Sequence, residues 1–500
     1  MNYRVMPKSD QLPYALYRAE QVRALDATAI NQFGIPGREL MARAGEAAFE
    51  LLIERWPDAQ DVTVVVGTGN NGGDGYVVAS LAKQAGMRVR VLQLGESERI
   101  SGDAKFFAEE WLDSANEYLE FTDLPRHTDV IVDGILGTGL EREVKGEWAD
   151  AIRKINAHRA PVLALDIPSG LHSDTGAVMG VAVKAECSIS FIGLKQGMFT
   201  GEAPDYCGEI SFDALDVPAQ IYASQLLSAR RIEWKKVKDR LSPRRRTAHK
   251  GHFGHVLVVG GDYGFGGAAL MAATAAARTG AGLVSLATRP EHIAAAISTQ
   301  PEIMAHAIAE ADQLDPLLMQ ASVVVLGPGL GQSPWGLALW NKVIQSSRLK
   351  VMDADALNLL AMQPMKSDNW VLTPHPGEAA RLLGVCIADT HQDRISTANT
   401  IVKRFGGSCV LKGAGSVIAT QGDYQPAICS EGNPGMASGG MGDVLSGVIG
   451  GFLAQGHDLD EATQLGVCLH AAAADVAANR GGEFALLATD LIDEFANLLP

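Results

Sequence analysis

The stretch VTVVVGTGNNGGDGYVVA, residues 62–79, joins a β-branched run to a glycine-rich loop and then to a second apolar segment. A continuous apolar run bounded by glycines is typical of a strand that is buried on both faces, as in a parallel sheet. The glycines between residues 67 and 75 suit the tight turn that leads from such a strand into a helix. This stretch therefore predicts the first β-α unit of an open α/β sheet.

Strand and helix patterns alternate along the rest of the chain. Helices are expected first at residues 19–31 and 39–55. Strand-like runs of the first half lie at residues 62–66, 87–94, 129–132, 161–165 and 187–192, and those of the second half at 255–259, 283–287, 322–326, 350–352, 370–372 and 409–411. The intervals leave room for helical crossovers, so both halves are predicted to contain mostly parallel sheets.

The length of 500 residues exceeds what one hydrophobic core usually supports. Between residues 218 and 250 the sequence becomes charged and shows no pattern of a buried strand, which is typical of a domain boundary. We therefore predict a domain over residues 1–225, a linker over 226–245 and a second domain over 246–500. The first is expected to be a Rossmann-like three-layer α/β/α sandwich, and the second another α/β domain.

Charge and cysteine content restrict the partners and the compartment. The formal net charge of -16 argues against binding to a nucleic-acid backbone or an anionic membrane. One basic run, Arg244, Arg245 and Arg246 with Lys250 nearby, is expected to be solvated rather than to bind phosphate. The six cysteines show no CxxC pair and no zinc-site spacing, which favours reduced thiols in a cytoplasmic protein without structural metal. The opening MNYRVMPKSD lacks the apolar core of an export signal.

Polar side chains follow several strands of the first half. The loop at residues 67–75 contains a GxGxxG pattern, but the next strand ends without the acid that would hold a ribose, which disfavours hydride transfer. Asp133, Asp166 and Lys195 follow other strands, and the carboxyl ends of parallel strands share one crevice. One such aspartate could simply cap a helix, but three groups beside the loop favour a ligand site. Oxygens of Asn71, Asp133 and Ser169 could also hold a hard cation.

A second glycine-rich segment, NPGMASGGMGDVLSG at residues 433–447, opens an apolar helix. Amides at a helix N-terminus stabilise anionic oxygens, and small residues let a phosphate approach the backbone. Asp443 lies where a general base would activate a hydroxyl toward phosphorus, although a capping aspartate in a plain turn is the alternative. KGAGS at residues 412–416 could cradle a nucleotide, and no GxxxxGK[ST] motif of a Walker NTPase occurs.

The strings NNGGDGYVVA, DGILGTGL and LDIPSGL, together with the segment around Lys195, resemble the epimerase domain of NAD(P)H-hydrate repair enzymes over nearly all of residues 15–220. The sequence departs from that pattern at Ala42, where an acidic residue is expected. We expect Asp166 and Lys195 to act as the acid and base, and the resemblance implies a potassium site at Asn71, Asp133 and Ser169. It implies substrate contacts at Asn70, Asn71, Gly72, Gly73, Asp74, Gly137, Thr138, Gly139, Leu140, Glu141, Arg142, Glu143 and Asp166.

The GMGD string resembles the anion-hole motif of the ribokinase-like superfamily. Together with HKGHFGHVLVVGG, GPGLG, TPHPGE and KGAGS it is similar, over nearly all of residues 240–495, to ADP-dependent NAD(P)H-hydrate dehydratases. The resemblance implies a ribokinase-like second domain with substrate contacts at Ala268, Gly329, His375 and Asp443. It implies adenine-nucleotide contacts at Lys412, Gly413, Ala414, Gly415, Ser416 and Gly442.

The two resemblances together imply a bifunctional repair enzyme for the hydrated cofactors NADHX and NADPHX. Its first domain would interconvert R and S epimers, and its second would dehydrate the S form with ADP and Mg²⁺, giving NAD(P)H, AMP and phosphate. A kinase for a vitamin precursor is the alternative, because GMGD is shared across that superfamily, but TPHPGE, KGAGS and the fused first half speak against it. A catalytically silent first domain is disfavoured by Asp133, Asp166 and Lys195. Glycine- and alanine-rich helices and the resemblance favour a homo-oligomer.

Overall fold

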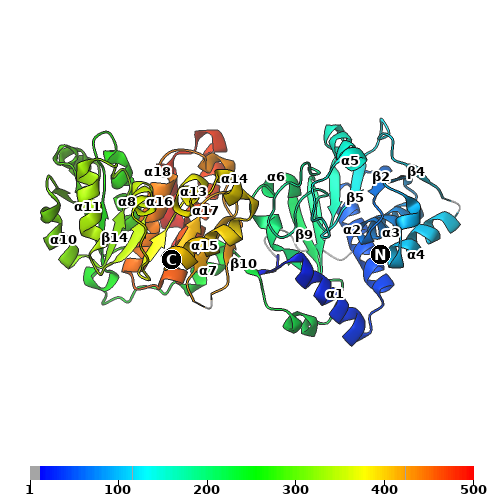
Figure 1. The fold of residues 1–500 in the computed structure, drawn as a ribbon, viewed down its shortest axis with the longest axis horizontal. Coiled ribbons are helices and arrows are strands. Elements are labelled where there is room, and N and C mark those ends of the chain that lie inside the picture. The colour runs from blue at the N-terminus through cyan, green and yellow to red at the C-terminus, as the bar shows by residue number, and fades with distance from the viewer. Residues whose placement is uncertain (1–11, 115, 423) are drawn as a thin grey trace. The chain divides into compact units, whose positions relative to one another are not determined.

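The computed structural model describes residues 12–114, 116–422 and 424–500, so the opening decapeptide lies outside the described residues. The chain divides into two compact units, Met1–Arg230 and Arg231–Pro500, each built from strands and helices (Figure 1). Among the described residues, no helix combines the length and the apolar character needed to cross a membrane.

The main sheet of the N-terminal unit is parallel throughout, in the order β4-β3-β2-β5-β6-β7-β9. The strands predicted from the sequence are present. Their bounds, with those of two further strands, are β2 (Asp61–Val66), β3 (Arg88–Gln93), β4 (Tyr118–Glu120), β5 (Val130–Gly134), β6 (Val162–Leu165), β7 (Cys187–Phe191) and β9 (Glu209–Asp213).

Helices cover both faces of this sheet. Val64 and Val66 belong to one core cluster, and Val65 between them belongs to another, because successive side chains of a strand point to opposite faces. The first cluster includes residues of α1 (Ala19–Phe33), α2 (Gly37–Arg55), α3 (Asn70–Gln84) and α4 (Gly102–Asp113), and the second those of α5 (Gly146–Ala157). Each fully buried valine contributes about 1.5–3 kcal/mol relative to an exposed one. The predicted three-layer sandwich is confirmed.

A short strand brings the start of the chain to Lys195. β1 (Ala15–Tyr17) pairs in parallel with β8 (Leu194–Lys195), with Tyr17 opposite Lys195, and antiparallel with β10 (Ala229–Ile232). Helix α1 begins two residues after β1. A Cβ at position 193 would lie 3.1 Å from Val22 of this helix, so α1 packs closely beside the strand that carries Lys195.

The C-terminal unit has a sheet in the order β13-β12-β11-β14-β15-β16-β17-β18-β19. It is parallel from β13 to β17, and β18 and β19 are antiparallel additions. The bounds are β11 (His255–Val259), β12 (Leu283–Thr288), β13 (Met304–Ala307), β14 (Val323–Leu326), β15 (Leu349–Met352), β16 (Trp370–Leu372), β17 (Ser408–Leu411), β18 (Ser416–Thr420) and β19 (Ala427–Cys429). All of the strands predicted for this half are present.

A core cluster of this unit joins one face of the sheet to helices that include α8 (Gly266–Thr279), α16 (Met441–Ala454), α17 (Leu459–Gly481) and α18 (Ala488–Leu498). A Cβ at position 447 would lie 2.1 Å from the carbonyl of Ala272, so only glycine lets α16 pack this closely on α8. Further helices of this unit are α9 (Ile293–Thr299), α10 (Asp315–Gln320), α11 (Pro334–Ile344), α12 (Asp355–Met362), α13 (Pro376–Leu383), α14 (Ile387–Gln392) and α15 (Arg394–Phe405), and the N-terminal unit also contains α6 (Pro204–Cys207).

The segment expected to be a linker, residues 226–245, is partly ordered core. It contains β10 and helix α7 (Trp234–Val237), and both Trp234 and Val237 are buried in the core of the C-terminal unit. These elements were not predicted from the sequence because they carry charges. Arg231, 3% exposed, donates to Glu233 Oε2 at 2.7 Å, so the two charges neutralise each other inside the fold. The basic run at residues 244–246 is solvent-exposed, as expected.

Candidate functional site

The carboxyl edge of the N-terminal sheet holds a buried cluster of oxygen atoms. Asp133, at the end of β5, accepts hydrogen bonds from the backbone amide of Ser169 at 2.8 Å and from its hydroxyl at 2.6 Å. Asn71 donates through Nδ2 to the carbonyl of Leu136, while its Oδ1 is buried and has no hydrogen-bond partner in the described part of the chain. Burial raises the pKa of Asp133 to about 6. The three residues predicted to hold a cation therefore lie together.

Asp166 and Lys195 form an ion pair at the same edge of the sheet. The Lys195 side chain is fully buried and also donates to Ser190 Oγ at 3.0 Å and to the carbonyl of Phe191 at 3.3 Å. Asp166 follows β6 in a left-handed conformation with φ +64°, which is unfavourable for a residue other than glycine. Such backbone strain concentrates at functional sites, so this geometry supports the assignment of Asp166 to the site.

Two further carboxyl groups face this ion pair. Burial is the main cause that raises the pKa of Asp74 well above its usual value. The charges of Asp166 and Asp26 raise this pKa further. Asp26 was not predicted from the sequence. It lies on α1, and burial raises its pKa to about 6 against the opposing charge of Lys195. The site thus combines a buried lysine with one paired and two protonatable carboxyls.

The predicted substrate-contact segments surround this cluster. Asn70 is exposed at the start of α3, whereas Asn71, Gly72, Gly73 and Asp74 are buried in its first turn. The loop that contains Gly137, Thr138, Gly139, Leu140, Glu141, Arg142 and Glu143 follows β5 and is exposed at most of its positions. A Cβ at position 137 would lie 3.4 Å from Cβ of Asn71, so this loop begins beside the start of α3. Ala42 lies within α2, which forms despite the missing acidic residue.

The C-terminal site centres on Asp443 in the first turn of α16. Burial raises the pKa of Asp443 to about 7, and Asp353 adds to the rise while Lys412 opposes it. Lys412 donates to Asp353 Oδ1 at 2.7 Å. A Cβ at position 442 would lie 3.2 Å from Nζ of Lys412 and 3.3 Å from Oδ2 of Asp353, so the glycine-rich turn lies directly against this ion pair.

Asp353 was not predicted from the sequence, although the signal was present. It follows the buried strand β15 directly, as Asp166 follows β6, and it is 1% exposed. The hydroxyl of Thr373 donates to Asp353 Oδ1 at 2.8 Å, which fixes the carboxylate beside Lys412. Burial acts to lower the pKa of Lys412, but Asp353 and Glu378 outweigh it and raise that pKa.

His375 begins the TPHPGE helix, α13. Its ring caps the helix by accepting from the amide of Gly377 at 3.0 Å, and Glu378 Oε2 accepts from the amide of His375 at 2.8 Å. Glu378 is buried, which raises its pKa to about 7, and it lies 3.8 Å from Nζ of Lys412. Burial and the nearby cations lower the pKa of His375, so its ring is neutral at pH 7.

The remaining predicted contacts adjoin this network. Gly329 has φ +59°, and a Cβ there would lie 2.5 Å from the carbonyl of Phe265 and 3.3 Å from Cβ of Ala268. These two positions therefore lie side by side at the start of α8. The loop formed by Lys412, Gly413, Ala414, Gly415 and Ser416 turns from β17 to β18. Buried Arg394 donates to the carbonyls of Leu411 and Lys412 at 3.0 and 3.2 Å, which holds the base of this loop.

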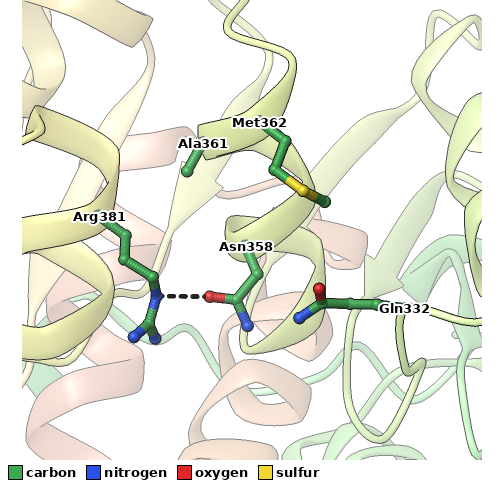
Figure 2. A pocket seen from close by; sticks show the side chains of 5 residues that line it. All are labelled: Gln332, Asn358, Ala361, Met362 and Arg381. Atoms are coloured by element: carbon green, nitrogen blue, oxygen red, sulfur yellow. Dashed lines mark hydrogen bonds between the residues drawn. The ribbon is translucent and has the colours of Figure 1, made fainter.

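A cleft of about 540 Å³ opens on the same unit (Figure 2). Arg381 of α13 donates from Nε to Asn358 Oδ1 of α12 at 2.8 Å, and Figure 2 shows the Gln332 amide extending toward Asn358. Ala361 and Met362 complete the lining. Because Arg381 acts electrostatically on His375, the cleft lies near the TPHPGE segment.

Both sites are suited to acid-base chemistry. A carboxyl whose pKa is near 7 exchanges a proton readily at neutral pH, which is the property of a general base or acid. In the C-terminal unit such a carboxyl stands beside glycine amides at a helix N-terminus, where anionic oxygens are stabilised. In the N-terminal unit the buried ion pair lies beside a cluster of oxygen atoms that offers ligands for a cation.

Two family models match the chain. Residues 37–197 match the model described as YjeF-related protein N-terminus, and residues 256–497 match the model described as NAD(P)H-hydrate dehydratase. A ribokinase-like superfamily protein of Enterococcus faecalis resembles the chain with a TM-score of 0.51 and 27% identity, covering 55% of this chain and 98% of its own. The expected ribokinase-like fold of the C-terminal unit is confirmed.

Full-length relatives share both units. The bifunctional NAD(P)H-hydrate repair enzyme Nnr of Coxiella burnetii is 49% identical over 95% of this chain and 97% of its own length. The enzyme of the same name from Escherichia coli is 44% identical over 98% of this chain and 94% of its own. The chain therefore belongs to the family of bifunctional NAD(P)H-hydrate repair enzymes, with an epimerase domain followed by a dehydratase domain.

Proposed function

We propose that the N-terminal unit interconverts the R and S epimers of NADHX and NADPHX, with Asp166 and Lys195 as the groups that move protons. The epimeric ring carbon bears a hydroxyl and is bonded to the ring nitrogen. Inverting it requires a proton to be given to and taken from these atoms while one bond to the carbon breaks and re-forms. The ion pair of Asp166 and Lys195, with two protonatable carboxyls beside it, supports this role.

The substrate of this unit would lie against the first turn of α3 and the loop after β5. Asn70, Asn71, Gly72, Gly73 and Asp74 form that turn, and the loop carries residues 137–143. The close approach of position 137 to Asn71 supports one continuous surface for the ligand. Amides at the start of α3 suit the phosphates of a dinucleotide.

Asn71, Asp133 and Ser169 are the residues that would hold K⁺. The buried Oδ1 of Asn71 has no hydrogen-bond partner among the described residues, and no lysine or arginine of the described residues pairs with the buried Asp133 carboxylate. A monovalent cation with oxygen ligands would satisfy both groups. When bound, the ion would supply positive charge and fix the loop that follows β5.

In the C-terminal unit we propose that Asp443 is the general base of an ADP-dependent dehydration of the S epimer. Its carboxyl takes the proton of the ring hydroxyl, and the oxygen forms a bond to the β-phosphorus of ADP as the bond to the AMP oxygen breaks. The lone pair of the ring nitrogen then expels phosphate, and loss of a neighbouring ring proton gives NAD(P)H. Hydroxide is a poor leaving group and phosphate a good one, which explains the requirement for ADP.

The nucleotide would bind the loop from Lys412 to Ser416 and the amide of Gly442, and the substrate would contact Ala268, Gly329, His375 and Asp443. The observation that carries this proposal is the position of Gly442 against Lys412 and Asp353, beside a carboxyl whose pKa is about 7. Amides and a lysine there would stabilise the charge of the transferred phosphoryl group. Two carboxylates, Asp353 and Asp355, add to the raised pKa of Asp443, and these are the residues that would hold Mg²⁺, which would supply charge neutralisation.

The deciding experiment is the recovery of dihydronicotinamide absorbance from a mixture of NADPHX epimers. With ADP and Mg²⁺, recovery should pass the fraction of S epimer present at the start, because both activities operate. Recovery that stops at the S fraction would contradict the epimerase proposal alone. Absence of recovery, together with phosphorylation of a hydroxymethyl compound, would instead support the kinase alternative that the shared GMGD motif leaves open.

A further inference from the structure

The C-terminal unit contains a second cluster of ligating side chains that the dehydratase chemistry does not use. Cys429 ends strand β19, Glu431 follows two residues later, and Cys468 lies on α17. One ligand atom from each residue lies within 4.8 Å of the other two. Both thiols are free. Because 39 residues separate the cysteines in sequence, their spacing gave no sign of this arrangement.

The geometry of the cluster matches a tetrahedral metal ion. The two sulfur atoms are 3.9 Å apart. Two thiolates bound to Zn²⁺ at about 2.3 Å with a tetrahedral angle are separated by about 3.8 Å. The sulfur atoms therefore already have the spacing that zinc would impose, and only the carboxylate has to approach the ion.

Glu431 is oriented by the backbone. Its Oε2 accepts a hydrogen bond from the amide of Trp234 at 2.7 Å, which leaves Oε1 free to act as a ligand. Ligating carboxylates in metal sites are commonly held by such a second hydrogen bond. Two buried cysteines could pack as small apolar side chains, but that packing does not explain a carboxylate turned toward both sulfur atoms.

We propose that Cys429, Glu431 and Cys468 bind a thiophilic divalent cation, with Zn²⁺ as the ion that this donor set fits. Three protein ligands leave a fourth position for water. The cysteines are 1% and 0% exposed, so the ion would lie away from bulk solvent. Binding would release the protons of both thiols and replace them by coordination bonds.

The ion would tie β19 to α17 at the start of the glycine-rich segment. Gly432 and Asn433, which follow Glu431, are already held by Asp475 of α17 through hydrogen bonds of 2.9 and 2.8 Å. The chain then runs to Gly440 and Asp443. We therefore expect the bound ion to stabilise the C-terminal unit and the approach to its anion hole, without touching the substrate.

Cobalt titration of the full-length, reduced and chelator-treated protein tests this proposal. Co²⁺ should bind one per chain with thiolate-to-metal charge-transfer absorption, and one equivalent of Zn²⁺ should abolish that absorption. Cys386→Ser, which removes an exposed cysteine, is the matched control and should titrate as the natural chain does. Glu431→Gln keeps both thiols and should weaken binding at least tenfold.

Cys468→Ser should abolish the absorption bands and the rise of Tm that Zn²⁺ gives the natural chain. If Cys468→Ser does not fold, the cobalt titration of Glu431→Gln alone tests the proposal, because this variant leaves the packing of the sulfur atoms unchanged. The proposal is overturned by an absence of charge-transfer bands, by unchanged binding in Glu431→Gln, or by unchanged bands in a folded Cys468→Ser. Formation of a Cys429–Cys468 disulfide under mild oxidation, with no metal uptake by the reduced protein, would also overturn it.

Discussion

The two units each place one lysine among three carboxyl groups, but they differ in which carboxyl group is left without an ion pair. In the N-terminal unit Lys195 pairs with Asp166, and Asp26 and Asp74 keep raised pKa values. The Lys195 side chain is fully buried and donates three hydrogen bonds, so its position is fixed.

In the C-terminal unit Lys412 pairs with Asp353, and Glu378 and Asp443 keep pKa values of about 7. Glu378 is tied to the backbone of α13, whereas no ion pair of the described residues holds the Asp443 carboxyl. One lysine cannot neutralise three carboxylates in a low-dielectric site, so the excess groups stay protonatable. The proposed reactive group is therefore the paired aspartate in one unit and the unpaired aspartate in the other.

The largest effect is expected for the unpaired group. Asp443→Asn should lower the rate of ADP-dependent dehydration by about 10²- to 10⁴-fold, the usual loss when a general base is removed. Epimerisation should be unchanged, because the N-terminal unit does not use this residue. Single-turnover kinetics with pure S epimer measure the first quantity, and the exchange of R and S forms measured by chromatography gives the second. Equal dehydration rates in the variant and the natural chain would refute the assignment.

The same substitution should stabilise the fold at neutral and alkaline pH. Asp443 keeps its proton in the native state up to a pH of about 7, whereas in the unfolded chain it loses the proton near pH 3.9. The native state therefore binds more protons between these values, and this residue's contribution to stability falls as the pH rises through that window. Asp443→Asn removes this penalty, so it should raise the free energy of unfolding by about 2 to 4 kcal/mol at pH 8 and change it little at pH 4.

Urea unfolding at pH 4 and pH 8 measures this difference. Asp353→Asn is the matched control on the paired group. It should destabilise the unit at both pH values, because Lys412 loses the carboxylate that neutralises it. If Asp443→Asn is instead less stable than the natural chain at pH 8, the prediction is wrong. The Asp443 carboxylate would then stabilise the fold.

The strands were predictable from the sequence because most are short, largely apolar runs, and the sites were located because aspartates follow those runs directly. It could not reveal Asp26, since this residue lies on a helix and reaches Lys195 only through the pairing of β1 with β8. Asp353 carries the same signal as Asp133 and could have been found. The charged strand β10 was missed because its buried arginine is neutralised by a neighbour, Glu233, that sequence patterns do not pair with it.

A smaller effect is expected for Asp26. Asp26→Asn removes a negative charge that raises the pKa of Asp74, so that pKa should fall. With protonated Asp74 in the active form, the high-pH limb of the epimerisation profile should move to lower pH, and the rate at pH 7 should fall about tenfold, or ~1.4 kcal/mol. Glu20→Gln, an exposed carboxyl on the same helix, is the control and should change neither quantity. An unshifted profile in Asp26→Asn would mean that Asp26 acts only through packing.

The smallest effect concerns the cation that the N-terminal unit is proposed to hold. Potassium at ten times its dissociation constant stabilises the protein by about 1.4 kcal/mol, which raises the Tm of a unit of this size by about 3–6 °C. Sodium and choline at equal ionic strength separate this effect from screening.

Asn71→Ala should abolish the shift of Tm, because it removes the buried Oδ1 that has no protein partner among the described residues. Asn70→Ala, at the exposed neighbouring position, should keep it. An equal rise of Tm with potassium in both variants would show that potassium binds elsewhere. The buried Asp133 carboxyl would then have no cation beside it, and its pKa would stay at about 6.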